Sequence, residues 1–118
     1  MIRLAVCALA VLVLTALPAQ AARQGTVLKL ATASGASLKF STSALKARPG
    51  TVTIVLSNRG MMPHNVAVKG AGVNVKGKVV GTGGTSTVTA RLKRGRYEFY
   101  CSVPGHEQAG MKGVLTVG

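Results

Sequence analysis

The sequence predicts an all-β domain, an antiparallel β-sandwich or barrel of about seven to eight short strands. β-branched and apolar residues alternate with polar ones over short stretches, and turn residues recur at intervals of about 8 to 12 residues. No segment shows a convincing helical period. The alternating threonines and valines fit sheets that turn one face to solvent.

The first half of the domain contains one clear strand and two weaker ones. Residues 26–31 (TVLKLA) alternate β-formers with a lysine and predict a first strand, and residues 37–40 predict a second short run. Residues 41–48 are ambiguous and could form one helical turn. After the turn at residues 49–50 (PG), residues 51–57 (TVTIVLS) are dense in β-branched side chains and predict the clearest strand of the chain.

The second half predicts the remaining strands. Residues 64–69 (HNVAVK) follow a proline and predict a strand, whereas the glycine-rich residues 70–84 predict a loop with one weak strand. Residues 85–90 (TSTVTA) alternate again. Residues 96–101 form a strand in which Tyr97, Phe99 and Cys101 would share one face, and residues 113–117 close the domain.

The N-terminus has the pattern of an export signal. Arg3 precedes an apolar run at residues 4–17, and residues 19–21 (AQA) fit a secretory peptidase site. The run is short for a spanning helix, which needs about 20 residues. We therefore expect a cleaved signal peptide at residues 1–21, a single domain at residues 22–118, and a periplasmic or extracellular protein. The alternative is an uncleaved N-terminal anchor.

The charge balance is strongly basic. The chain has 15 Lys and Arg against two acidic residues, so that loss of Arg3 would leave a formal net charge of +12. Nucleic acid is disfavoured because the protein is expected to be exported and has only two Tyr, two Phe and no Trp to stack on bases. A solvated basic surface and steering toward an acidic protein partner or an anionic membrane surface both stay open. One cluster of basic residues consists of Arg91, Lys93, Arg94 and Arg96.

Cysteine, histidine and methionine side chains gather in one segment near the C-terminus. Cys101, His106 and Met111 are each separated from the next by four residues, and His64 is the other histidine of the chain. Removal of the signal peptide would remove Cys7, so Cys101 could form no disulfide within the mature chain. Thiolate and thioether ligands favour a soft ion, and imidazole suits both oxidation states of copper. The four residues therefore predict a mononuclear copper site.

Each of these residues also has a simpler interpretation. Met111 alone could fill the core, His64 could be a structural histidine, and Cys101 could be an inert buried thiol. Zn²⁺ accepts a Cys-His₂ ligand set, and Cys101 with His106 could form a nucleophile pair. The copper interpretation uses all four residues together, which none of the alternatives does.

Three motifs carry a resemblance to a known family. PGTVTIVLSN, PHNVAV and FYCSVPGHEQAGMKGVLTV cover most of the domain and are similar to the cupredoxins, specifically the plastocyanin-like and auracyanin-like bacterial members. The resemblance implies a Greek-key β-sandwich with one type 1 copper ion that cycles between Cu(I) and Cu(II). It makes His64, Cys101 and His106 the equatorial ligands and Met111 the axial ligand.

The resemblance also assigns residues around the ligands. Asn65 would tie the segment of the first ligand to the cysteine loop, with Ser102 as its partner. His106 would be the ligand nearest the surface, inside an apolar rim where electrons enter and leave. The candidates for that rim are Met61, Met62, Pro63, Val103 and Pro104.

The resemblance implies an exported one-electron carrier, with a copper-delivery protein as the alternative. An enzyme is not expected, because copper oxidases and nitrite reductases need additional histidines and both histidines are already used. Ser102 and Val103 supply no second cysteine for a binuclear centre. We expect a monomer whose partners are redox proteins such as a cytochrome or a membrane oxidoreductase. The acidic docking patch of plant plastocyanins is absent, since the only carboxylate side chains are Glu98 and Glu107.

Overall fold

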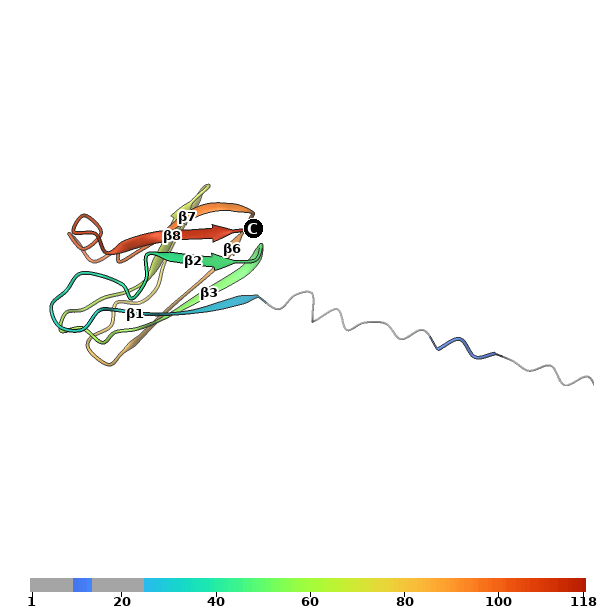
Figure 1. The fold of residues 1–118 in the computed structure, drawn as a ribbon, viewed down its shortest axis with the longest axis horizontal. Helices are drawn as coiled ribbons and strands as arrows, with labels where there is room; N and C mark the ends of the chain where they lie inside the picture. Colours follow the sequence, from blue (N-terminus) through green and yellow to red (C-terminus); the bar gives the residue numbers. More distant parts are fainter. Residues whose placement is uncertain (1–9, 14–24) are drawn as a thin grey trace, which may run out of the picture.

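The computed structural model describes residues 10–13 and 25–118, and residues 25–118 contain eight strands and no helix (Figure 1). The strands are β1 (Thr26–Ala31), β2 (Ala44–Ala47), β3 (Gly50–Ser57), β4 (Ala67–Gly70), β5 (Val73–Lys76), β6 (Thr85–Leu92), β7 (Gly95–Tyr100) and β8 (Lys112–Val117). Among the described residues no helix is long and apolar enough to span a membrane. The expected signal peptide lies outside the described residues, apart from residues 10–13.

The strands form two sheets that pack face to face. One sheet has the order β1-β3-β6 and the other β2-β8-β7-β4-β5. The all-β sandwich is therefore confirmed, but its sheets are mixed. Strands β1 and β3 pair in parallel, as do β2 and β8, and the remaining pairs are antiparallel. In each parallel pair one partner, β1 or β2, is the edge strand of its sheet, and at least one other strand separates it in sequence from its partner.

The core lies between the sheets and follows the alternation in the sequence. Every second residue of β6 is buried, and in β3 the buried side chains include Ile54 and Leu56, which are fully enclosed. Phe99 of β7 and Leu115 of β8 face them from the second sheet. A side chain at Gly113 would lie 2.2 Å from the Phe99 ring, so only glycine fits beside this ring.

Two local expectations were wrong, and one segment that was ambiguous in the sequence contains a strand. Residues 41–48 contain strand β2 and no helical turn, because Ala44–Ala47 pair with β8. Residues 37–40 form no strand and contribute only the isolated bridge between Thr32 and Phe40. The strand expected at residues 64–69 begins at Ala67 instead, and His64 is held by an isolated bridge to Val80.

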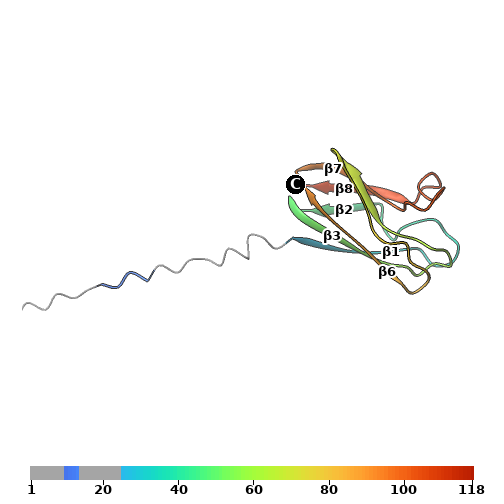
Figure 2. The same ribbon diagram turned by 180° about the vertical axis from the view of Figure 1, so that it is seen from behind.

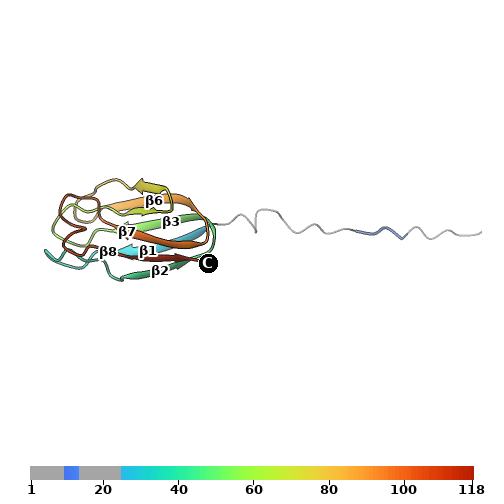
Figure 3. The same ribbon diagram turned by 90° about the horizontal axis from the view of Figure 1, so that it is seen from above.

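The sandwich has two distinct ends. The loop of residues 101–111 lies at one end, and the C-terminus lies at the other (Figures 1 and 2). Strand β7 connects them, since it begins at Gly95 beside Val117 and ends at Tyr100 immediately before Cys101. The view from above shows the same separation (Figure 3). We call the end that carries residues 101–111 the loop end.

Candidate metal centre

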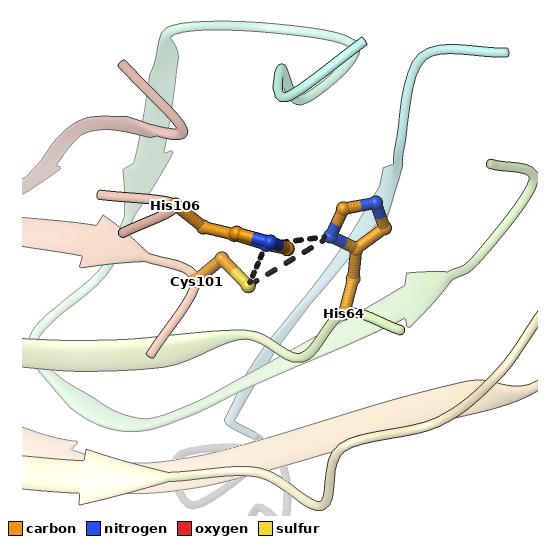
Figure 4. Close-up of side chains that lie close together, drawn as sticks. All are labelled: His64, Cys101 and His106. Atoms are coloured by element: carbon orange, nitrogen blue, oxygen red, sulfur yellow. Dashed lines mark hydrogen bonds between the residues drawn. The ribbon is translucent and has the colours of Figure 1, made fainter. Parts of the chain in front are cut away.

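Three potential ligand atoms meet inside the loop end (Figure 4). The Nδ1 atoms of His64 and His106 are 3.2 Å apart, and the Cys101 Sγ lies 3.9 Å from the first and 3.5 Å from the second. His64 and Cys101 are fully buried, and His106 is 5 % exposed. The two histidines and the cysteine expected from the sequence are thus brought together, although 37 residues separate His64 from Cys101.

His64 is fixed by its backbone in a segment without regular strand structure. Its N–H donates to the Val80 carbonyl at 3.0 Å, and its carbonyl accepts from the Val80 N–H at 2.9 Å. The imidazole packs against Gly60, where an added Cβ would lie 3.3 Å from Nε2. This two-way bridge holds the first histidine in place of the strand that the sequence suggested.

The loop of residues 101–111 is closed by hydrogen bonds between the backbones of the candidate ligands themselves. The Cys101 N–H donates to the Met111 carbonyl at 3.1 Å, and the Met111 N–H donates to the His106 carbonyl at 3.0 Å. Gly105 and Gly110 have φ angles of 84° and 105°, which other residues rarely adopt, and they turn the chain between these points. Met111 is fully buried in the core cluster next to Cys101. The fold therefore fixes all three loop residues by their main chain.

Asn65 connects the two segments that supply the ligands. Its side-chain oxygen accepts from the Ser102 N–H at 2.8 Å, and its Nδ2 donates to the Ser102 Oγ at 2.7 Å and to the Gly77 carbonyl at 3.0 Å. Asn65 is 1 % exposed. The two bonds to Ser102 join the residue after His64 to the residue after Cys101, which fixes one ligand segment relative to the other, and the third bond ties Asn65 to Gly77.

The protonation of His64 suits a ligand role. Burial lowers the pKa of His64 below its ordinary value, and the neighbouring His106 lowers it further. A neutral imidazole presents a lone pair, which a metal ion requires. Within the described part of the chain its Nε2 is buried without a hydrogen-bond partner, and its Nδ1 faces the other two ligand atoms. The ring is therefore neutral and directed into the site.

The donor set fits a single metal ion. Two nitrogens and a sulfur that share one ion, at bond lengths of about 2.0 Å and about 2.3 Å, lie roughly 3.3–3.8 Å from each other. The observed separations of 3.2, 3.5 and 3.9 Å are close to these values. Three electron-rich atoms that converge in a buried space would repel each other, and a cation between them compensates all three.

A profile of the family described as copper binding proteins, plastocyanin/azurin family, matches residues 27–118. The chain belongs to this family, the cupredoxins. The match covers all strands of the domain except the first residue of β1. A search of curated proteins found no match.

Solved cupredoxin structures share the fold. The chain is 24 % identical to a reduced auracyanin from Roseiflexus castenholzii, with a TM-score of 0.69 over 79 % of this chain and 97 % of the other. It is 23 % identical to auracyanin A from Chloroflexus aurantiacus, with a TM-score of 0.66 over 79 % and 98 %. For an azurin from Methylomonas sp. strain J the values are 19 %, 0.65, 79 % and 98 %.

Family membership and geometry together identify the cofactor of this cupredoxin as copper. His64, Cys101 and His106, with Met111 in the same loop, have the arrangement of a type 1 copper site. The soft donor set agrees with this, since a thiolate and a thioether beside two imidazoles favour copper over harder ions.

The surface over the centre of this cupredoxin is apolar. His106 is the less buried of the two histidines, and Met61 is 75 % exposed and Met62 36 % exposed next to the His64 segment. Pro63 and Pro104 are exposed, and Val103 is partly buried against the core. The residues suggested for a rim are thus largely at the surface of the loop end.

An ion cluster that the sequence did not predict lies beside the centre. Lys69 Nζ lies 2.5 Å from Glu107 and 3.2 Å from Glu98, and it lies 4.4 Å from the centre of the Tyr100 ring. The hydrogen bonds that Lys69 donates to Glu107 and, to a smaller extent, to Glu98 raise the pKa of Lys69, and burial raises the pKa of Tyr100. Glu107 follows His106, so the cluster links the loop to the sheet. The only signal in the sequence was that both carboxylates lie near the loop.

Proposed function

We propose that this cupredoxin is an exported one-electron carrier whose copper ion cycles between Cu(I) and Cu(II). One observation carries the proposal: the His64, Cys101 and His106 ligand atoms already lie within one ion's reach in a buried and hydrogen-bonded frame. A frame that holds its ligands in place limits rearrangement when the charge of the ion changes by one. Small rearrangement is what a carrier of single electrons requires.

Each residue has a proposed role in this function. His64, Cys101 and His106 would hold the ion in the trigonal plane, and Met111 would be its weak axial ligand. When bound, copper supplies the centre that gains and loses the electron. The Asn65–Ser102 hydrogen bonds would keep Cys101 oriented, and the apolar surface around His106 would exclude water and admit a redox partner.

A catalytic role has less support. Among the described residues the only group of histidine, cysteine and carboxylate side chains that could hold a metal is the one formed by His64, Cys101 and His106. Both histidines of the chain therefore belong to a single centre. An enzyme of the multicopper type would need a second one.

Copper delivery is the second candidate, and the exposed methionines favour it. Met61 and Met62 place two accessible thioethers directly before the His64 segment, and thioethers suit Cu(I). They could receive or release the ion at the surface. A carrier keeps its copper during turnover, whereas a delivery protein loses it to an acceptor.

Export rests on the N-terminal sequence. The positive residue, the apolar run and the A-x-A pattern support a secretory signal, and the buried thiol of Cys101 is compatible with an oxidising compartment when a metal protects it. We propose a periplasmic or extracellular protein with redox proteins as partners.

The test is an optical and EPR spectrum of the purified protein loaded with copper. We expect an intense charge-transfer band from the thiolate in the red part of the visible spectrum, a type 1 EPR signal and a reversible potential. Cys101→Ser should abolish the band, whereas Cys7→Ser, in the expected signal peptide, should leave it unchanged. A band that persists in Cys101→Ser would rule out the assignment.

A second measurement separates the two candidate functions. The copper-loaded protein is mixed with a competing Cu(I) chelator, and the loss of copper is followed over time. Slow loss together with a reversible potential supports the carrier. Rapid loss that slows in a Met61→Leu/Met62→Leu double variant supports delivery.

A further inference from the structure

Six basic side chains gather at the end of the sandwich opposite the loop end. All six are exposed. We call this surface the basic end, and it consists of Lys46, Arg48, Arg91, Lys93, Arg94 and Arg96.

Strand pairing explains why residues so distant in sequence meet there. Lys46 lies near the end of β2, whose last residue pairs with Val117 of β8, and Val117 also pairs with Gly95 at the start of β7. In the other sheet, the first residue of β3 pairs with the last residue of β6, which places Arg48 and Arg91 at the same end of the sheet. The turn between β6 and β7 adds Lys93 and Arg94. The C-terminus marks this end in Figure 1.

None of the six cations of the basic end forms an ion pair within residues 25–118. Every ion pair in this range involves Lys69 or Lys112 with Glu98 or Glu107. Glu98 and Glu107 both pair with Lys69, so neither forms an ion pair with the basic end, although Glu98 lies two residues after Arg96 on β7. Six like charges in one place repel each other and gain free energy when an anionic surface neutralises them.

We propose that the basic end binds an anionic phospholipid membrane and thereby turns the copper site toward the aqueous phase. Protein interfaces centre on exposed aromatic and apolar residues, with arginine enriched and lysine depleted. Leu92 and Val117 at the basic end are 2 % exposed, and Val27, the second residue of β1, is the one strongly exposed apolar side chain of that strand, so charge is the main means of recognition. Clusters of basic residues of this size are typical of surfaces that bind anionic lipids.

The position of the N-terminus supports the same orientation. Strand β1 begins at the basic end, where the Arg48 N–H donates to the Thr26 Oγ1 at 3.2 Å. The apolar run at residues 4–17 precedes this strand in the sequence. If the run is retained as a membrane anchor, the chain that leads from it reaches the domain at β1, next to the six cations. If it is removed, the cations alone would provide the membrane contact.

The orientation defines where a redox partner can bind. Strand β7 runs from the basic end to Cys101, so the basic end and the His106 surface lie at opposite ends of the sandwich. A domain that rests on its basic end presents His106 away from the lipid. The partner would then be a soluble protein or the part of a membrane complex that projects into the aqueous phase. The membrane contact does not depend on the electron-carrier proposal, because none of the six cations touches the copper ligands.

The test uses residues 22–118 loaded with copper and mixed with phosphatidylcholine vesicles that contain or lack phosphatidylglycerol. This segment contains all eight strands, and the match to the solved auracyanin and azurin structures covers 97 % and 98 % of those chains. Co-sedimentation gives the partition coefficient at low and at raised ionic strength, and the blue band reports that the domain is folded. We expect binding only to vesicles with phosphatidylglycerol, and weaker binding as salt is added.

Two matched double variants separate the basic end from net charge. Lys93→Gln/Arg94→Gln removes two cations from the basic end, and Lys76→Gln/Lys78→Gln removes two exposed cations toward the loop end. Each basic residue at an anionic membrane contributes about a fivefold factor, so the first variant should bind about 25-fold more weakly. The second should change the partition coefficient far less.

Two results would overturn the proposal. Equal losses in the two variants would show that binding follows net charge and that the basic end has no special role. Absence of binding to phosphatidylglycerol vesicles at low ionic strength would exclude the membrane and would leave an acidic protein as the partner of this surface. In either case the spectrum and potential of the copper site would stand as an independent result.

Discussion

Replacing Asn65 should weaken both the fold and the copper centre. Asn65→Ala removes the hydrogen bonds to the Ser102 N–H, the Ser102 Oγ and the Gly77 carbonyl. Because the site is almost fully buried, water could replace these partners only in part. The segment that carries His64 and the loop that carries Cys101 would then be joined mainly through the metal.

The expected magnitude follows from the number of bonds. A hydrogen bond contributes about 0.5–1.5 kcal/mol net, so three of them correspond to about 2–4 kcal/mol of unfolding free energy. For a domain of this size such a loss lowers the melting temperature by on the order of 10–25 °C. Ser102→Ala is the matched control, since it removes only the bond to the Ser102 Oγ and keeps the backbone bond. It should lose about 0.5–1.5 kcal/mol.

The assay is urea unfolding of the metal-free proteins, followed by the rate of copper release from the loaded proteins. Metal-free protein is used first because bound copper adds its own binding free energy to the stability. We expect the order wild type, Ser102→Ala, Asn65→Ala in both measurements. If Asn65→Ala is no less stable than Ser102→Ala and releases copper no faster, Asn65 does not connect the two segments in the way we describe.

Three further predictions concern the ligand loop, the core and pH. Met111→Leu should keep copper but raise the reduction potential, because a donor to Cu(II) is lost while the volume of the side chain is preserved. An unchanged potential in voltammetry would mean that Met111 only fills the core. Gly113→Ala should lower the unfolding free energy by about 1–3 kcal/mol or more through contact with Phe99, whereas Gly81→Ala, whose added Cβ meets no atom within 4 Å, should have little effect in urea titrations. The metal-free protein should lose stability as pH falls below about 6.5, because His64 has a lowered pKa when folded and the unfolded chain binds the proton more tightly; denaturant titrations from pH 8 to pH 5.5 that show constant stability above this value and a decline below it would agree, and a flat profile would contradict it.

The strands that could be predicted are those with a strong local pattern. In β3 and β6 the alternation of apolar and polar residues reflects burial on one face, so the periodicity itself specifies the strand. Strand β2 could not be predicted in this way, because its four residues (ALKA) suit a helix as well as a strand and become extended only by pairing with β8. The parallel pairs were missed for the same reason, since register between distant segments leaves no local trace.

In the candidate site, too, residues close together in sequence could be predicted, whereas contacts between distant segments could not. Cys101, His106 and Met111 lie within one short segment, so their spacing alone suggested a ligand loop. His64 could be added because the chain has only one other histidine, but the means by which it is held was wrong, since a bridge to Val80 replaces the expected strand. The Lys69 cluster could not be foreseen, because its carboxylates follow it by 29 and 38 residues.

The sequence by itself determined the chemistry of this protein: the thiolate of Cys101 and the thioether of Met111 in one segment, two imidazoles, few carboxylates and an excess of basic residues. These properties depend on residue type and spacing, which a chain displays before it folds. Only the tertiary structure decided that the ligand atoms meet at one end and six unpaired cations at the other. The physical reason is that strand pairing brings together residues from distant parts of the chain, and its register decides which of them share an end of the sandwich.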